Sequence, residues 1–229
     1  MYTAIRKLAL VGVAVLGLTA CSDDDDATGP VATGDVRIVH ASPNAPAVDV
    51  LVDDAYALTG VAYRGASMFI PVEAGSRRVR VRATGTSTTV IDAEVPITQG
   101  ESYTILATGL LAGIQPLVAE NDLTAPAAGQ VKVRVIHAAP AAAGVDVYVT
   151  APGAPLTGPV LTNVPFRAVS NYLSVPAGTY QIRVTPTGTT TVAIDATVTF
   201  TAGQIRTIVA TDAPGGGAPL APVVLAELN

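Results

Sequence analysis

The chain of 229 residues has one cysteine, no tryptophan and few other aromatic residues. A single cysteine cannot form an internal disulfide, which excludes a disulfide-stapled fold. Aromatic residues make up 4% of the chain although hydrophobic residues make up 49%, so any core must be built from Val, Ile, Leu and Ala. The scarcity of aromatics also counts against a carbohydrate-binding module, because Tyr and Trp dominate binding hot spots.

Basic residues are few, and two of them lie in a leader. Arg6 and Lys7 precede an apolar run at 8–18, and Cys21 closes the sequence LTAC. The run is too short to span a bilayer, which takes about 20 residues, and LTAC resembles the lipobox of bacterial lipoproteins. We therefore expect residues 1–20 to be a lipoprotein signal peptide and Cys21 to be a lipidated membrane anchor. An ordinary secretory peptide with an incidental cysteine is the alternative.

An acidic segment follows the leader. Ser22 and four aspartates at 23–26 open the stretch 21–34, which we interpret as a solvated tether because like charges repel one another. The acidic run also resembles the surface-export signals of some lipoproteins. Ser22, rather than Asp, directly after the cysteine resembles the pattern of lipoproteins that are sorted to the outer membrane. The sequence thus favours the outer membrane of a bacterial cell envelope and leaves surface exposure open.

The acidic excess argues against nucleic acid as a partner. Without the leader, 11 basic residues remain against 18 acidic ones, a net charge of −7, and such a chain repels phosphates. Four arginines do cluster within residues 77–82, where alternation with Val79 and Val81 places three of them on one solvent-facing side of a strand. The second copy of this segment keeps only Arg183, so the cluster is not a feature that the copies share.

The chain contains a duplication. Residues 36–50 read VRIVHASPNAPAVDV and residues 133–147 read VRVIHAAPAAAGVDV. The correspondence continues downstream, at 63–64 and 166–167, 72–75 and 175–178, and 90–93 and 193–196. A period of about one hundred residues exceeds that of solenoid repeats, so we expect each copy to have its own core.

Short runs of Val, Ile, Thr and Tyr, bounded by Gly and Pro, predict strands in both copies. We expect them near 35–41, 47–53, 56–63, 67–72, 76–83, 89–96, 102–109 and 114–120, and again near 131–138, 144–150, 160–166, 169–175, 179–186, 192–200, 204–211 and 219–227. This pattern predicts an all-β fold of two tandem antiparallel β-sandwich domains, immunoglobulin-like or transthyretin-like, after the signal peptide. The cysteines and tryptophan of antibody domains are missing, so the comparison concerns architecture alone.

The duplication also suggests where the domains lie. We expect domain 1 at 35–122, a linker at 123–130 and domain 2 at 131–229. The linker is short enough for the two domains to touch. Around 151–160 the second copy carries about six extra residues rich in Pro and Gly.

Each copy has one histidine at the same position of its first strand. Alternation places His40 on the side of Val36 and Ile38, and His137 on the side of Val133 and Val135. That side is expected to be buried, so we interpret both as structural imidazoles that bond the loop that follows. One histidine per domain cannot build a zinc site alone.

Aspartates also recur at equivalent positions, Asp49 with Asp146 and Asp92 with Asp195. Calcium requires six to eight oxygen ligands, usually from closely spaced carboxylates, whereas these aspartates are isolated within strands. Asp49 and Asp146 should face away from their valine neighbours. We therefore group His40, Asp49, His137 and Asp146 as a structural motif and predict neither a metal site nor a cofactor.

The sequence offers no convincing nucleophile. Ser42 lies two residues after His40, but the second copy has Ala139 in its place, and no Gly-x-Ser-x-Gly motif occurs. We therefore expect no catalytic residues and no enzymatic activity. A hydrolase would require a histidine within about 3 Å of a carboxylate and a hydroxyl.

The segment HASPNAPAVDV at 40–50, with its degenerate partner at 137–147, resembles the signature of the bacterial envelope family of domains of unknown function 4397 (DUF4397). The pairs at 63–64 and 166–167 and the Ala-Gly turns at 74–75 and 177–178 also fit that family. The second copy departs from the signature where Ala139, Ala141 and Ala143 replace Ser42, Asn44 and Pro46. The resemblance implies an extracytoplasmic β-rich domain, often in tandem, with no established activity.

Two functional hypotheses follow. The first is a non-enzymatic, lipid-anchored envelope protein that acts as a structural, adhesive or partner-binding module, with loops and exposed strand edges as its binding surfaces. The alternative is a surface lipoprotein that binds a polysaccharide or small ligand. It would require an exposed aromatic pair, for which the candidates are Tyr56, Tyr63, Tyr148 and Tyr172.

Overall fold

The computed structural model describes residues 31–228, so the predicted signal peptide, Cys21 and most of the acidic tether lie outside the described residues. The described part contains sixteen strands and one short 3₁₀ helix, η1 (Leu111–Gly113). Every strand expected from the sequence has a counterpart, and the predicted all-β fold is confirmed. Within residues 31–228, no helix is long and apolar enough to cross a membrane.

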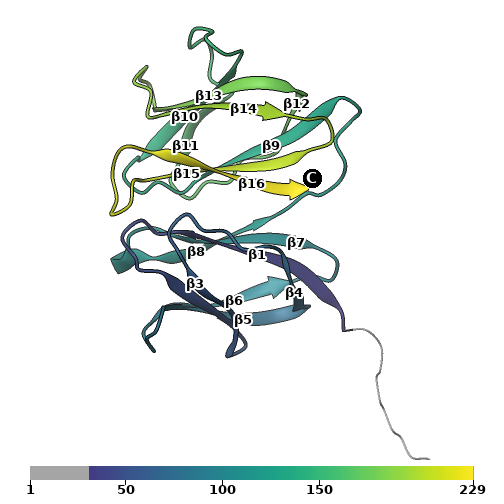
Figure 1. The fold of residues 1–229 in the computed structure, drawn as a ribbon, viewed down its shortest axis with the longest axis vertical. Coiled ribbons are helices and arrows are strands. Elements are labelled where there is room, and N and C mark those ends of the chain that lie inside the picture. The colour runs from purple at the N-terminus through teal and green to yellow at the C-terminus, as the bar shows by residue number, and fades with distance from the viewer. Residues whose placement is uncertain (1–30, 229) are drawn as a thin grey trace, which may run out of the picture. The chain divides into compact units, whose positions relative to one another are not determined.

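The strands divide equally between the two copies (Figure 1). Repeat 1 contains β1 (Thr33–Ala41), β2 (Val48–Val52), β3 (Ala55–Val61), β4 (Ile70–Glu73), β5 (Gly75–Ala83), β6 (Thr89–Ile97), β7 (Ser102–Thr108) and β8 (Gln115–Glu120). Repeat 2 contains β9 (Gln130–His137), β10 (Gly144–Thr150), β11 (Leu161–Pro165), β12 (Leu173–Pro176), β13 (Gly178–Pro186), β14 (Ile194–Phe200), β15 (Ile205–Thr211) and β16 (Ala221–Leu228).

Each repeat is a sandwich of two four-stranded sheets. The inner sheets have the strand orders β4-β1-β7-β8 and β12-β9-β15-β16, and the outer sheets have the orders β3-β2-β5-β6 and β11-β10-β13-β14. Most neighbouring strands are antiparallel, as predicted. One pair in each inner sheet, β1 with β7 and β9 with β15, is parallel.

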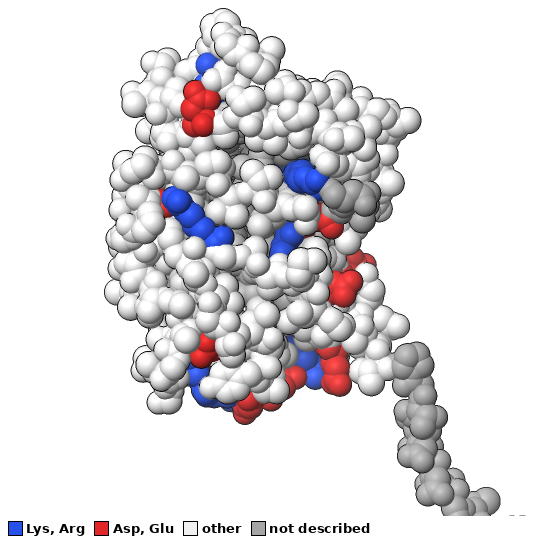
Figure 2. Space-filling model, viewed as in Figure 1, with Lys and Arg blue, Asp and Glu red and all other residues white. Residues whose placement is uncertain are grey.

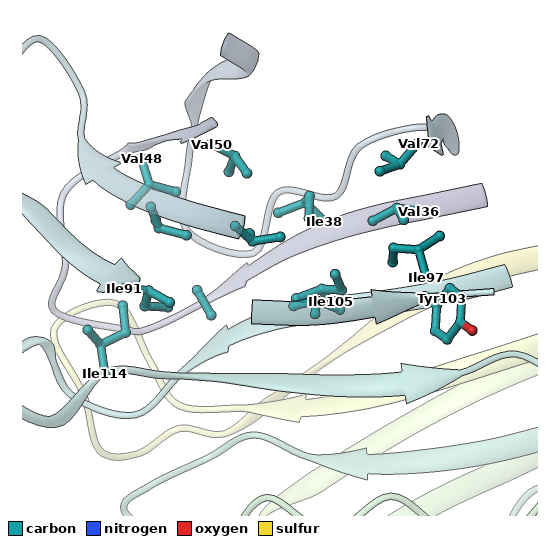
Figure 3. Close-up of a cluster of buried hydrophobic side chains, with 14 residues drawn as sticks. Val36, Ile38, Val48, Val50, Val72, Ile91, Ile97, Tyr103, Ile105 and Ile114 are labelled. Atoms are coloured by element: carbon teal, nitrogen blue, oxygen red, sulfur yellow. The ribbon is translucent and has the colours of Figure 1, made fainter. Parts of the chain in front are cut away.

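Branched aliphatic side chains fill each sandwich. Figure 3 shows Val36 and Ile38 of β1 beside Ile105 of β7, with Val48 and Val50 of β2 supplying the facing layer. Repeat 2 repeats this core with Val133, Val135, Val145, Val147 and Ile208. Each buried side chain of this size contributes about 1.5–3 kcal/mol, so a core without tryptophan is sufficient.

The central strands of the inner sheets, β1, β7, β9 and β15, are buried on both faces, which distinguishes them from the strands of the outer sheets. In β1, residue 35 is exposed, and residues 36–41 are all buried although their side chains alternate between the two faces of the sheet. Ile38 faces its own core, whereas Val39 and Ala41 belong to a separate apolar cluster that also contains Ile136 and Val209 of repeat 2. The two inner sheets therefore pack against each other, and we refer to this contact as the joint.

Candidate functional site

His40 at the end of β1 is completely buried and holds the loop that follows it. Its Nε2 lies 2.9 Å from the carbonyl oxygen of Pro46, and its Nδ1 accepts a hydrogen bond from the backbone N–H of Ser42 at 3.3 Å. Since Nδ1 accepts, Nε2 must carry the proton and donate, which describes a neutral imidazole. The ring of Tyr63 packs edge-on against it, with 6.0 Å between the ring centroids.

His137 repeats this arrangement in repeat 2. Its Nε2 lies 3.0 Å from the carbonyl oxygen of Ala142, its Nδ1 accepts from the N–H of Ala139 at 3.3 Å, and Phe166 packs against it edge-on. Burial lowers the pKa of both histidines, and the backbone hydrogen bond only partly opposes this effect. Backbone groups thus engage both ring nitrogens of each histidine, which is the geometry of a structural imidazole.

Asp49 and Asp146 each connect an edge strand of an outer sheet, β3 or β11, to a neighbouring turn. Asp49 accepts hydrogen bonds from the N–H of Gly60 and the hydroxyl of Thr84, both at 2.8 Å. Asp146 accepts from the N–H groups of Asn163 at 2.8 Å and Gly188 at 3.0 Å. These hydrogen bonds lower the pKa of both carboxyl groups. Across residues 31–228, no group of three or more His, Cys, Asp or Glu side chains could hold a metal ion.

Two equivalent arginines cross the joint. Arg64 of repeat 1 donates from Nε to the hydroxyl of Thr211 at 3.0 Å and from Nη2 to the carbonyl of Asp212 at 2.6 Å. Arg167 of repeat 2 donates from Nε to the hydroxyl of Thr108 at 3.0 Å and from Nη2 to the carbonyl of the same residue at 3.2 Å. The contacts are therefore reciprocal.

A buried charged cluster lies in the joint. Glu227, whose side chain is 0% exposed, accepts from Arg37 of β1 at 2.5 Å, and Arg134 of β9 lies 3.5 Å away. Arg134 also donates to the side-chain oxygen of Asn121, and Thr207 donates to Glu227. Two buried guanidinium groups thus share one buried carboxylate.

Sequence reasoning did not single out this cluster. A signal was present, because an arginine occupies the second position of both copies of the repeated segment, at Arg37 and Arg134. Both arginines interrupt apolar strands on the side that faces the joint. Only the packing of one repeat on the other shows that this side is buried and that Glu227 meets both arginines there.

The arginine cluster of β5 lies on the outer sheet of repeat 1. Arg78 pairs with Asp92 at 2.6 Å and Arg80 pairs with Asp54, while the alternating residues Val79 and Val81 are buried. Figure 2 shows acidic and basic side chains gathered together over this end of the molecule. Three of the four arginines of this cluster, Arg77, Arg78 and Arg80, are therefore paired with carboxylates.

The outer sheet of repeat 2 has no equivalent arginine cluster and keeps only Arg183. Arg183 is buried and donates to the hydroxyl of Thr150 at 2.8 Å and to the carbonyl of Ala154 at 2.7 Å. Ala154 belongs to the extra loop at 151–160, which therefore contacts the outer sheet. In the same sheet, Asp195 accepts from the amide of Gln181 at 2.8 Å.

The four tyrosines singled out in the sequence do not form an exposed pair. Tyr56 is 59% exposed. Tyr148 is buried, Tyr63 donates its hydroxyl proton to the carbonyl of Asp212 at 2.7 Å, and the guanidinium of Arg134 lies 4.9 Å from the ring centroid of Tyr172. Tyr56 is therefore the one member of this set available as an aromatic platform.

A family model described as a domain of unknown function, DUF4397, matches the chain twice, over residues 34–148 and 144–229. No curated protein matches the chain.

Solved structures resemble the chain only distantly. CBMbc, of family CBM26, from Eubacterium rectale Amy13K in complex with maltoheptaose is 10% identical over 85% of this chain and 98% of its own, with a TM-score of 0.28. A structure described as alpha-glucan binding by a streptococcal virulence factor is 13% identical over 77% of this chain and 92% of its own, with a TM-score of 0.26. The Bacillus anthracis TIE protein is 10% identical over 79% of this chain and 34% of its own, with a TM-score of 0.26.

Proposed function

This chain belongs to the DUF4397 family of domains of unknown function, and we propose that it is a non-enzymatic, lipid-anchored protein of the bacterial cell envelope. Its two sandwiches would act as one rigid structural, adhesive or partner-binding module. Cys21 would hold the module at the outer membrane through its lipid, and the acidic residues at 23–26 would belong to the tether. Envelope proteins or polysaccharides are the partners that such a module would meet.

The use of the repeated polar side chains carries this proposal. His40 and His137 bond the loops that follow them. Asp49 and Asp146 bond edge strands of the outer sheets. Arg64 and Arg167 donate hydrogen bonds across the joint. A site for chemistry would need some of these groups to be turned toward a ligand. Here the duplicated motif supports the sandwiches and the contact between them, which is what a rigid module requires.

Rigidity of the module can be measured directly. Spin labels at Ser87→Cys and Thr190→Cys would report the distance between exposed loops of the two repeats in the full chain. We expect one narrow distance distribution, which broadens when Arg64→Ala and Arg167→Ala are combined. A broad distribution in the unaltered joint would contradict a rigid module.

The anchor is tested in cells. We expect the full chain to fractionate with the outer membrane and Cys21→Ser to lose both the lipid label and that fractionation. Protease treatment of intact cells then separates two orientations: digestion with a periplasmic control spared indicates surface display, and protection until permeabilisation indicates a periplasmic orientation. An unlabelled, soluble full chain would refute the lipid anchor.

A second candidate function is the binding of a polysaccharide or small ligand. The observation that favours it is Tyr56, an aromatic side chain that is 59% exposed on edge strand β3. Exposed aromatic side chains of this kind are enriched at binding hot spots.

A further inference from the structure

A groove lies beside Tyr56 in repeat 1. It runs between β3, an edge strand of the outer sheet, and β4, an edge strand of the inner sheet, and has a volume of about 460 Å³. Small-molecule sites typically have volumes of about 300–1,000 Å³. The apolar lining comes from the ends of the core, including Val52, Ile70 and Val72.

Polar groups in the groove are held in place by one arginine. Arg77 donates from Nη1 to Asp53 at 3.0 Å and to Glu73 at 3.3 Å, and from Nη2 to the carbonyl of Ala74 at 3.0 Å. The carboxylates remain accessible, since the side chain of Asp53 is 45% exposed and that of Glu73 is 61% exposed. The groove thus combines a flat aromatic surface with planar hydrogen-bonding groups in fixed positions.

The charge of the groove restricts its ligand. Asp53 and Glu73 outweigh Arg77 by one negative charge, so phosphates, sulfates and uronic acids are disfavoured. A ligand that covers Tyr56 and hydrogen-bonds to carboxylates must offer an apolar face together with hydroxyl donors. We propose that this groove binds a neutral saccharide segment, with a sugar ring over Tyr56 and hydroxyl groups donating to Asp53 and Glu73. This inference rests on the second candidate function.

Comparison of the two repeats shows whether the sandwich itself requires the groove residues. In repeat 2 the equivalent positions hold Pro159 for Tyr56, Thr150 for Asp53, Pro176 for Glu73 and Tyr180 for Arg77. Tyr180 donates its hydroxyl proton to the carbonyl of Pro176 at 2.8 Å and packs near Phe200. Because repeat 2 forms the same sandwich without any of the four, none of them is needed for the fold.

The test is native affinity electrophoresis of the full chain in detergent, through gels that contain a polysaccharide. The neutral probes are amylopectin, mixed-linkage β-glucan and arabinoxylan, and the anionic probe is polygalacturonate. We expect at least one neutral polysaccharide to retard the protein and polygalacturonate not to do so. Tyr56→Ala should weaken the retardation on the order of tenfold, the loss expected for a hot-spot aromatic, while Tyr56→Phe should retain it.

Met68→Ala is the matched control, because Met68 is 85% exposed and does not line the groove. Thermal melts of all variants should coincide, which would show that lost retention is not lost folding. Retardation by none of the three neutral probes, or retardation that survives Tyr56→Ala, would overturn the proposal. Either result would leave the spin-label and fractionation outcomes for the rigid, lipid-anchored module untouched.

Discussion

Arg64 and Arg167 occupy the same position in the two repeats, and each donates hydrogen bonds to the repeat to which it does not belong. Their acceptors are also equivalent, since Thr211 in repeat 2 corresponds to Thr108 in repeat 1. Both arginines have a positive φ, 64° and 69°, a conformation that costs a non-glycine residue roughly 1–2 kcal/mol. The reciprocal bonds across the joint offset this cost.

Two substitutions of Arg64 can separate the cost of its positive φ from the contribution of its hydrogen bonds across the joint. Arg64→Ala loses the bonds to Thr211 and Asp212 and should lower the free energy of unfolding by about 1.5–3 kcal/mol. Arg64→Gly loses the same bonds but relieves the backbone, so it should be about 1 kcal/mol less destabilising. Urea denaturation measures both, with Arg78→Ala as the control because its ion pair is exposed. Equal losses in the two variants would mean that no strain is stored at this position.

Glu227 is expected to be the most sensitive single charge in the joint. Glu227→Gln keeps the shape of the side chain but leaves Arg37 and Arg134 buried without a carboxylate. Breaking a buried pair in this way typically costs about 3–5 kcal/mol. Denaturant unfolding would show a midpoint shift of that size. A loss below about 1 kcal/mol would indicate that water or relaxation compensates the arginines.

Asn121 offers the opposite change. It lies where the pseudo-symmetry of the repeats would place a second Glu227, and its side-chain oxygen accepts from Arg134. Asn121→Asp would give each guanidinium its own carboxylate. We expect the free energy of unfolding to rise by about 1 kcal/mol at neutral pH, because hydrogen bonds to charged groups are stronger. Destabilisation would instead show that the hydrogen bond from the side-chain amide of Asn121 to the hydroxyl of Ser102, at 3.0 Å, contributes more than the added charge.

The two histidines predict an acid-sensitive fold. Burial lowers the pKa of His40 and His137 in the folded protein, whereas in the unfolded chain they titrate near about 6.5. The unfolded state therefore binds more protons below pH ~6.5, and stability falls as the pH drops toward the folded pKa values. Each histidine contributes a slope of up to about 1.4 kcal/mol per pH unit.

Denaturation at a series of pH values tests this assignment. The chain has two histidines, so His40→Gln should remove about half of the slope between pH ~6.5 and ~5. Asp49 and Asp146, whose pKa values are lowered by hydrogen bonds, contribute their loss only at lower pH, below about 3.9. An unchanged slope in His40→Gln would assign the acid sensitivity to other groups.

The amino-acid pattern was sufficient to predict the strands because the signals for a strand are local in the sequence. Alternation along 76–83 placed Val79 and Val81 inside and three of the four arginines on the opposite side, and Val79 and Val81 are buried in the structure. The same alternation placed His40 with Val36 and Ile38, facing the core of its own repeat. The pattern did not reveal that β1 pairs with β7 in parallel, because pairing between distant strands leaves no local signature.

The sequence by itself determined the duplication, the two β-sandwiches and the side of each strand that faces its own core, because the alternation of apolar residues is a local property of each segment. The tertiary structure decided what covers the other side. Val39 and Arg37 point away from the core of repeat 1, and only the packing of the inner sheets makes that side a second interior. Burial there depends on contacts with the other repeat, so the roles of Arg64, Arg134 and Glu227 arise from the joint.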